Sequence, residues 1–300
     1  MLYRKSLLDI APANVLAMIS IQILTRGERS LSSVLESIWS QAPSGYEVIL
    51  VDSTGNDWSR ECQIHPNLRV VHVPSNTRAL KGRYLANLES IGKYRLMLDA
   101  TRQLAPGVLG QFENLLTSYD MAVLREGSIG TSLWARLARI DREITSSPEN
   151  FRKSIQQRGG ILLPRLFKDW LLTSALDRLR EVLGPEKFSS ISYGEHHLIW
   201  EEALKLSSSV GMTPNVVLSH FEDETLIEIL KKYRWYGMSQ RELSMQLPYS
   251  TASRLTSHRR SYAGISLHSR LGVLPLYAVR TLSFLSGYYM PWPKQHPLNE

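Results

Sequence analysis

Continuous apolar runs alternate with segments of helical spacing through the first part of the chain. The predicted strands are Leu16–Leu24, Tyr46–Asp52, Leu68–Val73, Tyr94–Leu98 and Met121–Leu124, and the predicted helices between them are Ser30–Trp39, Arg78–Ser90 and Gly107–Leu116. A strand that is apolar at successive positions is buried on both faces, which is typical of a parallel sheet with helices on both sides. The pattern therefore predicts an α/β fold with an open, mostly parallel sheet flanked by helices.

The second half of the chain is less regular. We expect helices at Leu133–Ile144, Phe167–Leu183, Glu195–Ser207 and Thr225–Leu243, and short apolar strands at Ile161–Leu163 and Val216–Ser219. The glycine-bearing segment Arg125–Gly130 is predicted to be a mobile loop, and Thr145–Asn150, which contains Pro148, a connection. Because no repeat or linker marks a boundary, composition alone divides the chain into a domain at 1–247 and a helical, basic and aromatic tail at 248–300.

Charge and cysteine content narrow the class of protein. The 300 residues carry a net charge of +7, and nine basic residues between Lys231 and Arg280 are opposed only by Glu242. Such a segment attracts anions such as lipid headgroups, phosphates or nucleic acid, unless it is simply a solvated basic face. The single cysteine, Cys62, excludes an internal disulfide and agrees with a reducing compartment. The N-terminal residues lack the apolar core and cleavage site of a signal peptide.

Near its end the chain has an apolar and aromatic stretch, Leu271–Trp292, that contains Pro275 and Arg280. A membrane-spanning helix needs about 20 predominantly apolar residues, and a central arginine is costly there. With basic residues before it and a Tyr/Trp cluster at its end, the stretch suits a helix that lies in an anionic membrane surface. A packed C-terminal helix is the alternative.

Polar residues follow three of the predicted strands. Thr25, Asp52 and Asp99 come after the first, second and fourth strands, and ligands of open α/β sheets bind beyond these carboxyl ends. A single Asp at such a place is usually a helix cap or a turn former, but three polar ends on one rim favour a ligand site. The chain contains neither GxGxxG nor GxxxxGK[ST], which argues against a dinucleotide-binding or P-loop enzyme.

The order of motifs adds a resemblance to a known family. The chain contains ISIQILTRGERSLSSVLESIWSQ, YEVILVDST, ALKGRYLAN and YRLMLDAT, and later GEHHLIWEEALKL, NVVLSHF and KKYRWYG. From Leu16 to Gly237 this series resembles the family 2 glycosyltransferases of the GT-A fold. The resemblance implies transfer of a sugar from a nucleoside-diphosphate sugar, UDP- or GDP-linked, with inversion at the anomeric carbon.

The resemblance assigns roles to individual residues. It implies that Thr25, Asp52, Arg83 and Asp99 bind the nucleotide, with Asp52 accepting hydrogen bonds from the base. A carboxylate suits this role because charge-assisted hydrogen bonds are about twice as strong as neutral ones. A helix-surface arginine is the alternative for Arg83.

The metal site of the family is altered in this chain. Family members usually have D-x-D after the fourth strand, whereas this chain has Asp99-Ala100-Thr101. The resemblance implies Mg²⁺ or Mn²⁺ at Asp99, Gln103 and His220, held more weakly because Thr101 lacks the second carboxylate. Gln103 also matches the glutamine of the D-A-D-x-Q run in dolichyl-phosphate mannose synthases.

The catalytic motif is altered as well. Many family members have Gly-Glu-Asp, with the Asp as general base, where this chain has Gly194-Glu195-His196. We expect His196, beside Glu195, to act as the base, unless an anionic lipid phosphate is the acceptor and needs none. Lys231, Arg234 and Trp235 are similar to the Q-x-x-R-W motif of cellulose synthases, which implies that Arg234 holds the diphosphate.

Trp235 and Arg125 are the residues expected to bind the acceptor. Trp235 could stack on an acceptor sugar, with packing within the helix as the alternative. The sequence thus predicts sugar transfer to a lipid-linked or glycan acceptor by a cytoplasmic enzyme, peripheral at the inner face of the membrane. The altered motifs leave a second hypothesis open, a catalytically inactive protein that binds nucleotides or glycans. Nucleic acid is not expected as a partner, since no recognition motif accompanies the basic tail.

Overall fold

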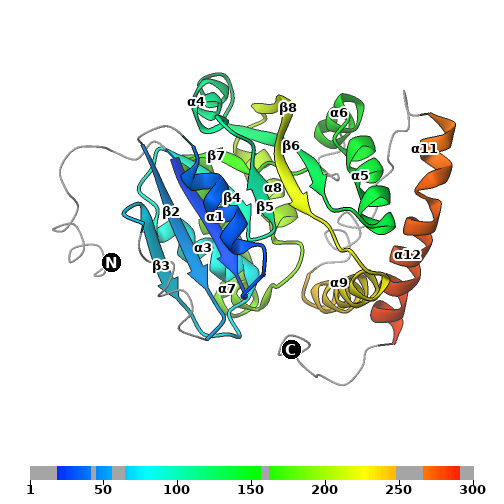
Figure 1. The fold of residues 1–300 in the computed structure, drawn as a ribbon. Coiled ribbons are helices and arrows are strands. Elements are labelled where there is room, and N and C mark those ends of the chain that lie inside the picture. Colours follow the sequence, from blue (N-terminus) through cyan, green and yellow to red (C-terminus); the bar gives the residue numbers. More distant parts are fainter. Residues whose placement is uncertain (1–18, 42–44, 56–64, 157–161, 248–265, 291–300) are drawn as a thin grey trace.

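A mixed sheet forms the centre of the structure, a computed structural model that describes residues 19–41, 45–55, 65–156, 162–247 and 266–290 (Figure 1). Within these ranges the eight strands of the sheet have the order β3-β2-β1-β4-β7-β6-β8-β5. Their bounds are β1 (Ile19–Thr25), β2 (Tyr46–Asp52), β3 (Leu68–His72), β4 (Tyr94–Asp99), β5 (Arg102–Leu104), β6 (Met121–Ile129), β7 (Leu166–Lys168) and β8 (Val210–Phe221).

The first half of the sheet is parallel and the second half is mixed. β1 pairs in parallel with β2 and β4, and β2 with β3, whereas β7 is antiparallel to both β4 and β6, and β5 to β8. β6 and β8 are parallel. The predicted open, mostly parallel α/β sheet with flanking helices is confirmed, and the antiparallel pairs are the short ones made by β5 and β7. The register places Thr25 opposite Asp52 and Leu24 opposite Asp99, so the carboxyl ends of three strands meet at one edge.

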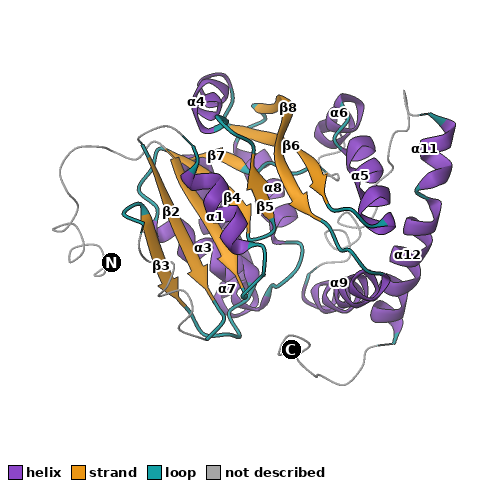
Figure 2. Cartoon of the chain, in the orientation of Figure 1, coloured by secondary structure: helices purple, strands orange, loops and turns teal. Residues whose placement is uncertain are grey.

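Helices cover both faces of this sheet (Figures 1 and 2). Their bounds are α1 (Leu31–Trp39), α3 (Ala79–Glu89), α4 (Leu109–Ser118), α5 (Leu133–Thr145), α6 (Pro148–Gln156), α7 (Asp169–Ser190), α8 (Glu195–Leu206), α9 (Leu226–Gln246), α11 (Leu267–Gly272) and α12 (Leu274–Tyr289). Helices α1 and α4 share one core cluster with the strands, and α7 and α8 share the cluster on the other face.

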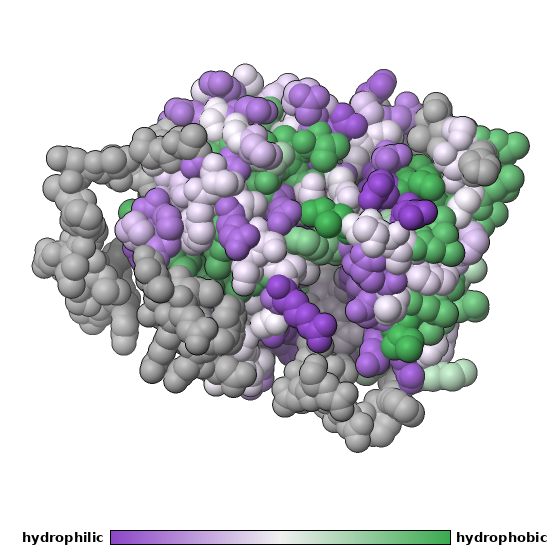
Figure 3. All heavy atoms as spheres, in the orientation of Figure 1, coloured by the Kyte–Doolittle hydropathy of each residue, from purple (hydrophilic) through white to green (hydrophobic). Residues whose placement is uncertain are grey.

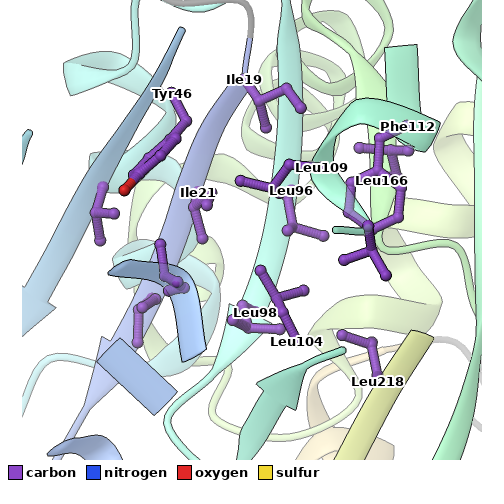
Figure 4. Packing of buried hydrophobic residues seen from close by; sticks show 14 of the residues in the cluster. Ile19, Ile21, Tyr46, Leu96, Leu98, Leu104, Leu109, Phe112, Leu166 and Leu218 are labelled. Atoms are coloured by element: carbon purple, nitrogen blue, oxygen red, sulfur yellow. The ribbon is translucent and has the colours of Figure 1, made fainter. Parts of the chain in front are cut away.

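Alternation of side chains along the strands divides the core between the two faces. Ile21 and Leu96 point toward α1 and α4 and pack there with Phe112 (Figure 4). The next residue after Leu96, Met97, belongs to the cluster beneath α7 and α8. Since strand neighbours point to opposite faces, continuous apolar runs are what a sheet covered on both sides requires.

Several predicted boundaries were wrong. Arg125–Gly130 is not a loop, because β6 continues to Ile129 beside the long strand β8, with register shifts around Arg125. The predicted connection at Thr145–Asn150 is shorter, since α6 begins at Pro148 and proline is tolerated in a first helical turn. The helix predicted to end at Leu183 breaks at Gly184, whose φ is +73°, and then continues to Ser190. The short strands β5 and β7 were not predicted.

The C-terminal helix α12 packs against α9 through two glycines. A Cβ at Gly237 would lie 2.0 Å from the carbonyl oxygen of Phe284, and one at Gly287 would lie 1.9 Å from that of Arg234. Only glycine permits this approach of the two backbones. On its inner side α12 is also tied to α5, where Asp141 accepts hydrogen bonds from Tyr277 at 2.7 Å and Arg280 at 2.6 Å.

The outer side of α11 and α12 carries an exposed apolar stripe, which we define as Leu267, Leu271, Leu274, Leu282, Leu285 and Tyr289. Apolar surface is visible over these two helices at the edge of the molecule in Figure 3. Among the described residues no helix is both long enough and apolar enough to cross a membrane.

Some sequence predictions fall on residues outside the described ranges. These are the N-terminal segment with the start of the Leu16–Leu24 strand, Cys62, Ile161, three basic residues of the tail (Arg254, Arg259 and Arg260) and Trp292. The domain boundary at 247/248 also lies where description stops, and it stays a prediction.

Candidate active site

A cavity of about 440 Å³ opens at the carboxyl ends of β1, β2 and β4. Of the predicted site residues, the cavity is lined by Thr25, Arg83, Asp99, Glu195, His196, His220 and Trp235. The charged residues of its lining are mainly basic: the basic ones are Arg26, Arg78, Arg83, Arg102, Arg165 and Lys232, and the acidic ones are Glu28, Asp99 and Glu195. This excess of positive charge suits an anionic ligand.

Arg83 is a buried residue of α3, not a helix-surface arginine. Its side chain is 1% exposed. Its Nη1 donates to the carbonyl oxygen of Leu98 at 2.9 Å, and its Nη2 donates to Asp99 Oδ1 and lies 3.1 Å from His196 Nε2. Arg83 therefore links the end of β4 to the start of α8.

Asp99 lies among three guanidinium groups. Its Oδ1 contacts Arg83, and its Oδ2 contacts Arg102 and lies 3.3 Å from Arg165 Nη1. Burial by itself would raise the pKa of Asp99, but Arg102, Arg165 and Arg83 together lower it well below its ordinary value. The carboxylate is thus ionised and neutralised by its neighbours.

Glu126 of β6 holds the same two arginines from the other side. Its Oε1 accepts from Arg102 Nε at 3.0 Å and from Arg165 Nε at 2.8 Å, and its Oε2 accepts from Arg142 Nη1 at 2.7 Å. These ion pairs fix the planes of the Arg102 and Arg165 guanidinium groups at the cavity.

His196 lies at the start of α8 with its side chain 13% exposed. Its Nε2 lies 3.7 Å from Asp99 Oδ1 and 3.5 Å from Glu195 Oε1. Burial lowers the pKa of His196 below 6.5, and the neighbouring Glu195 and Asp99 only partly oppose this shift. The imidazole is therefore neutral near pH 7, the form that can accept a proton.

The ends of β1 and β2 form the other end of the site. Asp52 Oδ1 accepts from the backbone N–H of Thr54 at 2.9 Å and from its hydroxyl at 2.7 Å. Asp52 Oδ2 is buried, forms no hydrogen bond within the described part of the chain, and lies 3.5 Å from His72 Nδ1. Thr25 is buried and donates to Glu28 Oε2 at 2.7 Å. Asp52 itself does not line the cavity, but its neighbours Val51 and Ser53 do.

One side of α9 forms an aromatic wall of the cavity. Trp235 and Tyr236 both line it, and both pack on Tyr193, with ring centroids 6.3 Å and 5.0 Å away. Lys232 lines the same wall and pairs with Asp223 at 3.1 Å. An aromatic face beside a cation suits a sugar or a phosphate-bearing acceptor.

The remaining predicted site residues lie elsewhere. Arg234 does not line the cavity; its backbone faces α12 at Gly287. Arg125 also lies outside the cavity, and its guanidinium donates to the carbonyl oxygen of Pro214. Gln103 donates to the carbonyl oxygen of Ser33 at 3.2 Å, on the α1 side of the sheet.

His220 is brought into the cavity by β8, next to Glu222. Its Nδ1 lies 3.4 Å from Glu222 Oε1. Burial, together with the nearby Arg142, lowers the pKa of His220 to about 3, so the ring is neutral near pH 7. The Glu222 carboxylate is ionised, since its neighbours His220 and Arg142 outweigh the effect of burial and lower its pKa.

The expected metal ligands do not form a site that suits Mg²⁺ or Mn²⁺. Both oxygens of Asp99 face guanidinium groups, and Gln103 is directed away from His220. At 4 Å and an effective dielectric constant of 20, a divalent ion and one guanidinium repel each other by about 8 kcal/mol. In the part of the chain that the structure describes, no three His, Cys, Asp or Glu side chains are grouped in a way that could hold a metal ion.

Sequence reasoning missed Arg102, Arg165 and Glu126. Arg102 directly follows the altered D-x-D motif, and a positive charge next to that motif was the one sequence signal that could have indicated its role in the site. Arg165 lies in no motif, and Glu126 fell in the segment predicted to be a loop.

Comparison with known proteins identifies the fold. No protein-family model matches the chain, and no curated protein matches it in sequence. Among solved structures, S. aureus TarS 1–349 aligns with a TM-score of 0.52 at 13% identity, over 90% of this chain and 81% of that one. The same fragment in complex with UDP-GlcNAc aligns with a TM-score of 0.51, at the same identity and coverage. The chain covers 54% of a longer TarS structure at 12% identity, with a TM-score of 0.50. At this identity the likeness concerns the fold alone, and the chain has a GT-A-type fold.

Proposed function

We propose that this protein is a glycosyltransferase that uses a nucleoside-diphosphate sugar. The observation that carries the proposal is the basic cavity at the carboxyl ends of β1, β2 and β4, between a buried carboxylate for the nucleoside and an aromatic wall for the acceptor. The S. aureus TarS structure with UDP-GlcNAc supports a nucleotide sugar as the ligand of such a fold. UDP or GDP carries the sugar in this proposal.

The nucleotide lies along the strand ends. The base lies at the ends of β1 and β2, where Asp52 Oδ2, buried beside the cavity-lining Val51 and Ser53 and without a hydrogen bond within the described residues, is its candidate acceptor. Thr25 lies beside the nucleoside, and the diphosphate faces Arg83, Arg102 and Arg165. Fixed positive groups stabilise the charge that develops on a leaving diphosphate and need no reorganisation during the reaction.

The acceptor oxygen attacks the anomeric carbon, and the bond between that carbon and the diphosphate oxygen breaks on the opposite face, with inversion. A hydroxyl acceptor, lipid-linked or on a glycan, passes its proton to His196, which is neutral and lies 3.5 Å from Glu195. A lipid-phosphate acceptor is already anionic and has no proton to lose. Trp235 stacks on the sugar of the acceptor, and Lys232 neutralises the phosphate of an acceptor that carries one.

A second candidate function is binding of nucleotides or glycans without catalysis. It is favoured by Asp99, whose charge is taken up by three arginines, and by the threonine at position 101. The two functions differ in turnover and not in nucleotide affinity.

Calorimetric titration with UDP, GDP and their sugars tests the proposal, followed by measurement of sugar release with and without candidate acceptors. We expect binding of one nucleotide and slow release of its sugar. Binding without release favours the inactive protein, and absence of binding by both nucleotides contradicts a nucleotide-sugar site. His196→Gln separates the two functions further, because it is expected to abolish transfer to a hydroxyl acceptor while nucleotide affinity is retained.

We further propose that the apolar stripe of α11 and α12 docks on an anionic membrane surface, at its cytoplasmic face. The support is an exposed apolar face on a chain with a charge of +7. Co-sedimentation with phosphatidylserine vesicles at low salt measures this, where screening is weakest. Leu282→Glu, at a residue 68% exposed, is expected to abolish binding, and Val182→Glu on α7, at 71%, is the matched control. Absence of binding by the unmodified protein at low salt contradicts membrane docking.

A further inference from the structure

We infer that this protein binds the diphosphate of its nucleotide without a divalent cation, because Arg102 and Arg165 supply the positive charge that a metal ion brings to a D-x-D site. This inference rests on the proposed nucleotide-sugar function and concerns how the same cavity holds its ligand. It starts from a disagreement between the sequence motif and the site: the motif predicts a weakened metal site, and the structure has a guanidinium cluster there.

The two arginines are held in place independently of any ligand. Asp99 and Glu126 each contact both of them, so the two guanidinium groups lie between two carboxylates. In this arrangement Arg102 uses Nη1 and Nε, and Arg165 uses Nη1 and Nε. A guanidinium has five N–H donors in a fixed plane, so each arginine retains donors beyond these pairs.

Both arginines keep an Nη2 group that these ion pairs do not use. Within the described part of the chain, neither Arg102 Nη2 nor Arg165 Nη2 forms a hydrogen bond, and both residues line the cavity. Arginine binds phosphate oxygens through paired N–H donors, and such charge-assisted bonds are about twice as strong as neutral ones. Two arginines with open Nη2 groups therefore form a preorganised diphosphate cradle.

Charge balance supports the same conclusion. The acidic residues of the lining are Asp99, Glu195 and Glu28, and the first two already have cationic or imidazole neighbours. A divalent ion would add two positive charges to a cavity whose lining is basic, whereas a diphosphate alone neutralises that excess. A second acid in the D-x-D position would offset part of this positive charge, but the residue there is the uncharged Thr101.

The test is titration of the full-length protein with UDP and, in parallel, GDP, once in buffer with EDTA and once with Mn²⁺. We expect the tighter-binding nucleotide to have the same affinity in both buffers within about threefold, whereas a site that needs the metal would bind at least about tenfold more tightly with Mn²⁺. Binding that appears only with Mn²⁺ overturns this inference and leaves the proposed function standing. Absence of binding by both nucleotides in both buffers overturns the proposed function and this inference with it.

Variants then test which residues replace the metal. Arg102→Gln is expected to weaken nucleotide binding in EDTA by about tenfold to a hundredfold, the range for losing a hydrogen bond to a charged group. Arg152→Gln, at an exposed residue of α6, is the matched control and should bind like the unmodified protein. Unchanged affinity of a folded Arg102→Gln protein contradicts the cradle.

Thr101→Asp covers the case in which Arg102→Gln does not fold, because Thr101 is only partly buried. An added carboxylate in the cavity is expected to weaken nucleotide binding in EDTA about tenfold and to create no Mn²⁺ site. Free Mn²⁺ is measured by electron paramagnetic resonance with saturating nucleotide and compared with the same nucleotide concentration without protein, because the nucleotide itself binds Mn²⁺. Thr117→Asp on the exposed side of α4 controls for the added charge. Tighter Mn²⁺ binding by Thr101→Asp, with nucleotide affinity retained, would show that the loop is a cation site and overturn the inference.

Discussion

Replacing Glu126 with glutamine removes one negative charge from the centre of the arginine cluster without changing the size of the side chain. Three guanidinium groups contact Glu126, at 3.0 Å from Arg102, 2.7 Å from Arg142 and 2.8 Å from Arg165. The side chain is 13% exposed, so water cannot take over these contacts. Removal of one partner from a buried ion pair typically costs about 3–5 kcal/mol, because the remaining charge stays buried without compensation. We expect Glu126→Gln to lower the free energy of unfolding by about this amount.

The measurement is urea unfolding at pH 7, followed by tryptophan fluorescence. Glu113→Gln, at an exposed residue of α4, is the matched control and should change the free energy of unfolding by less than about 0.5 kcal/mol. A loss of less than about 1 kcal/mol in Glu126→Gln would refute the idea that this carboxylate holds the three arginines.

The pH dependence of the same pair of proteins provides a second check. Burial would raise the pKa of Glu126, but Arg102, Arg165 and Arg142 lower it far below 4.5. A carboxylate with a lowered pKa stabilises the folded state fully above its unfolded pKa and loses this contribution as pH falls toward the folded pKa. The difference in unfolding free energy between the unmodified protein and Glu126→Gln should therefore be largest near neutral pH and decrease below about pH 4.5. A difference that is constant down to pH 3 would contradict an ionic origin.

Three further predictions follow from single contacts. Asp52→Asn keeps the acceptor for Thr54 but replaces the free carboxylate oxygen, and calorimetry should show a loss of about 1.5–3 kcal/mol in nucleotide binding; equal affinity would place the base elsewhere. The pKa of His220 is lowered from 6.5 to about 3, so the unmodified protein should lose about 3 kcal/mol of unfolding free energy between pH 7 and pH 4. His220→Gln should not show this loss, and parallel pH profiles of the two proteins would contradict the prediction. Gly237→Ala places a Cβ 2.0 Å from the Phe284 carbonyl oxygen and should cost about 1–3 kcal/mol in thermal unfolding; an unchanged melting temperature would mean that the two helices do not meet there.

How far the fold was predictable depended on how much of each element is buried. β1, β2 and β4 are interior strands of the covered sheet, so nearly every residue in them is buried and most are apolar, and their predicted bounds were close to correct. β5 and β7 have three residues each, too few for any periodicity to be recognised. The second half of β6 is polar because its side chains lie outside the core, with Glu126 in the arginine cluster and Ser128 donating to Glu222, and it was therefore mistaken for a loop.

Some residues of the candidate site were likewise predictable from the sequence and others were not. Thr25, Asp52 and Asp99 were predictable because the ends of parallel strands share one edge. The arginine cluster was not, because it depends on pairing between distant segments. Arg102 is opposite His220 only through the antiparallel register of β5 and β8, and Arg165 reaches Asp99 across 66 positions of sequence. The locations of Arg234 and Gln103 depended on side-chain direction, which a motif does not specify.

Helix α9 has one side in the cavity, at Trp235, and the other against α12, at Gly237. At Gly237 and Gly287 the two backbones are in direct contact, and beside these points the packed side chains of Tyr233 and Arg280 link the helices, so α9 and α12 shift together. Under the proposed function, a surface that binds the outer side of α12 therefore acts on the aromatic wall of the cavity through one rigid layer. By thermodynamic reciprocity, an acceptor that fixes Trp235 must change the affinity of α12 for that surface by the same factor as the surface changes the affinity for the acceptor.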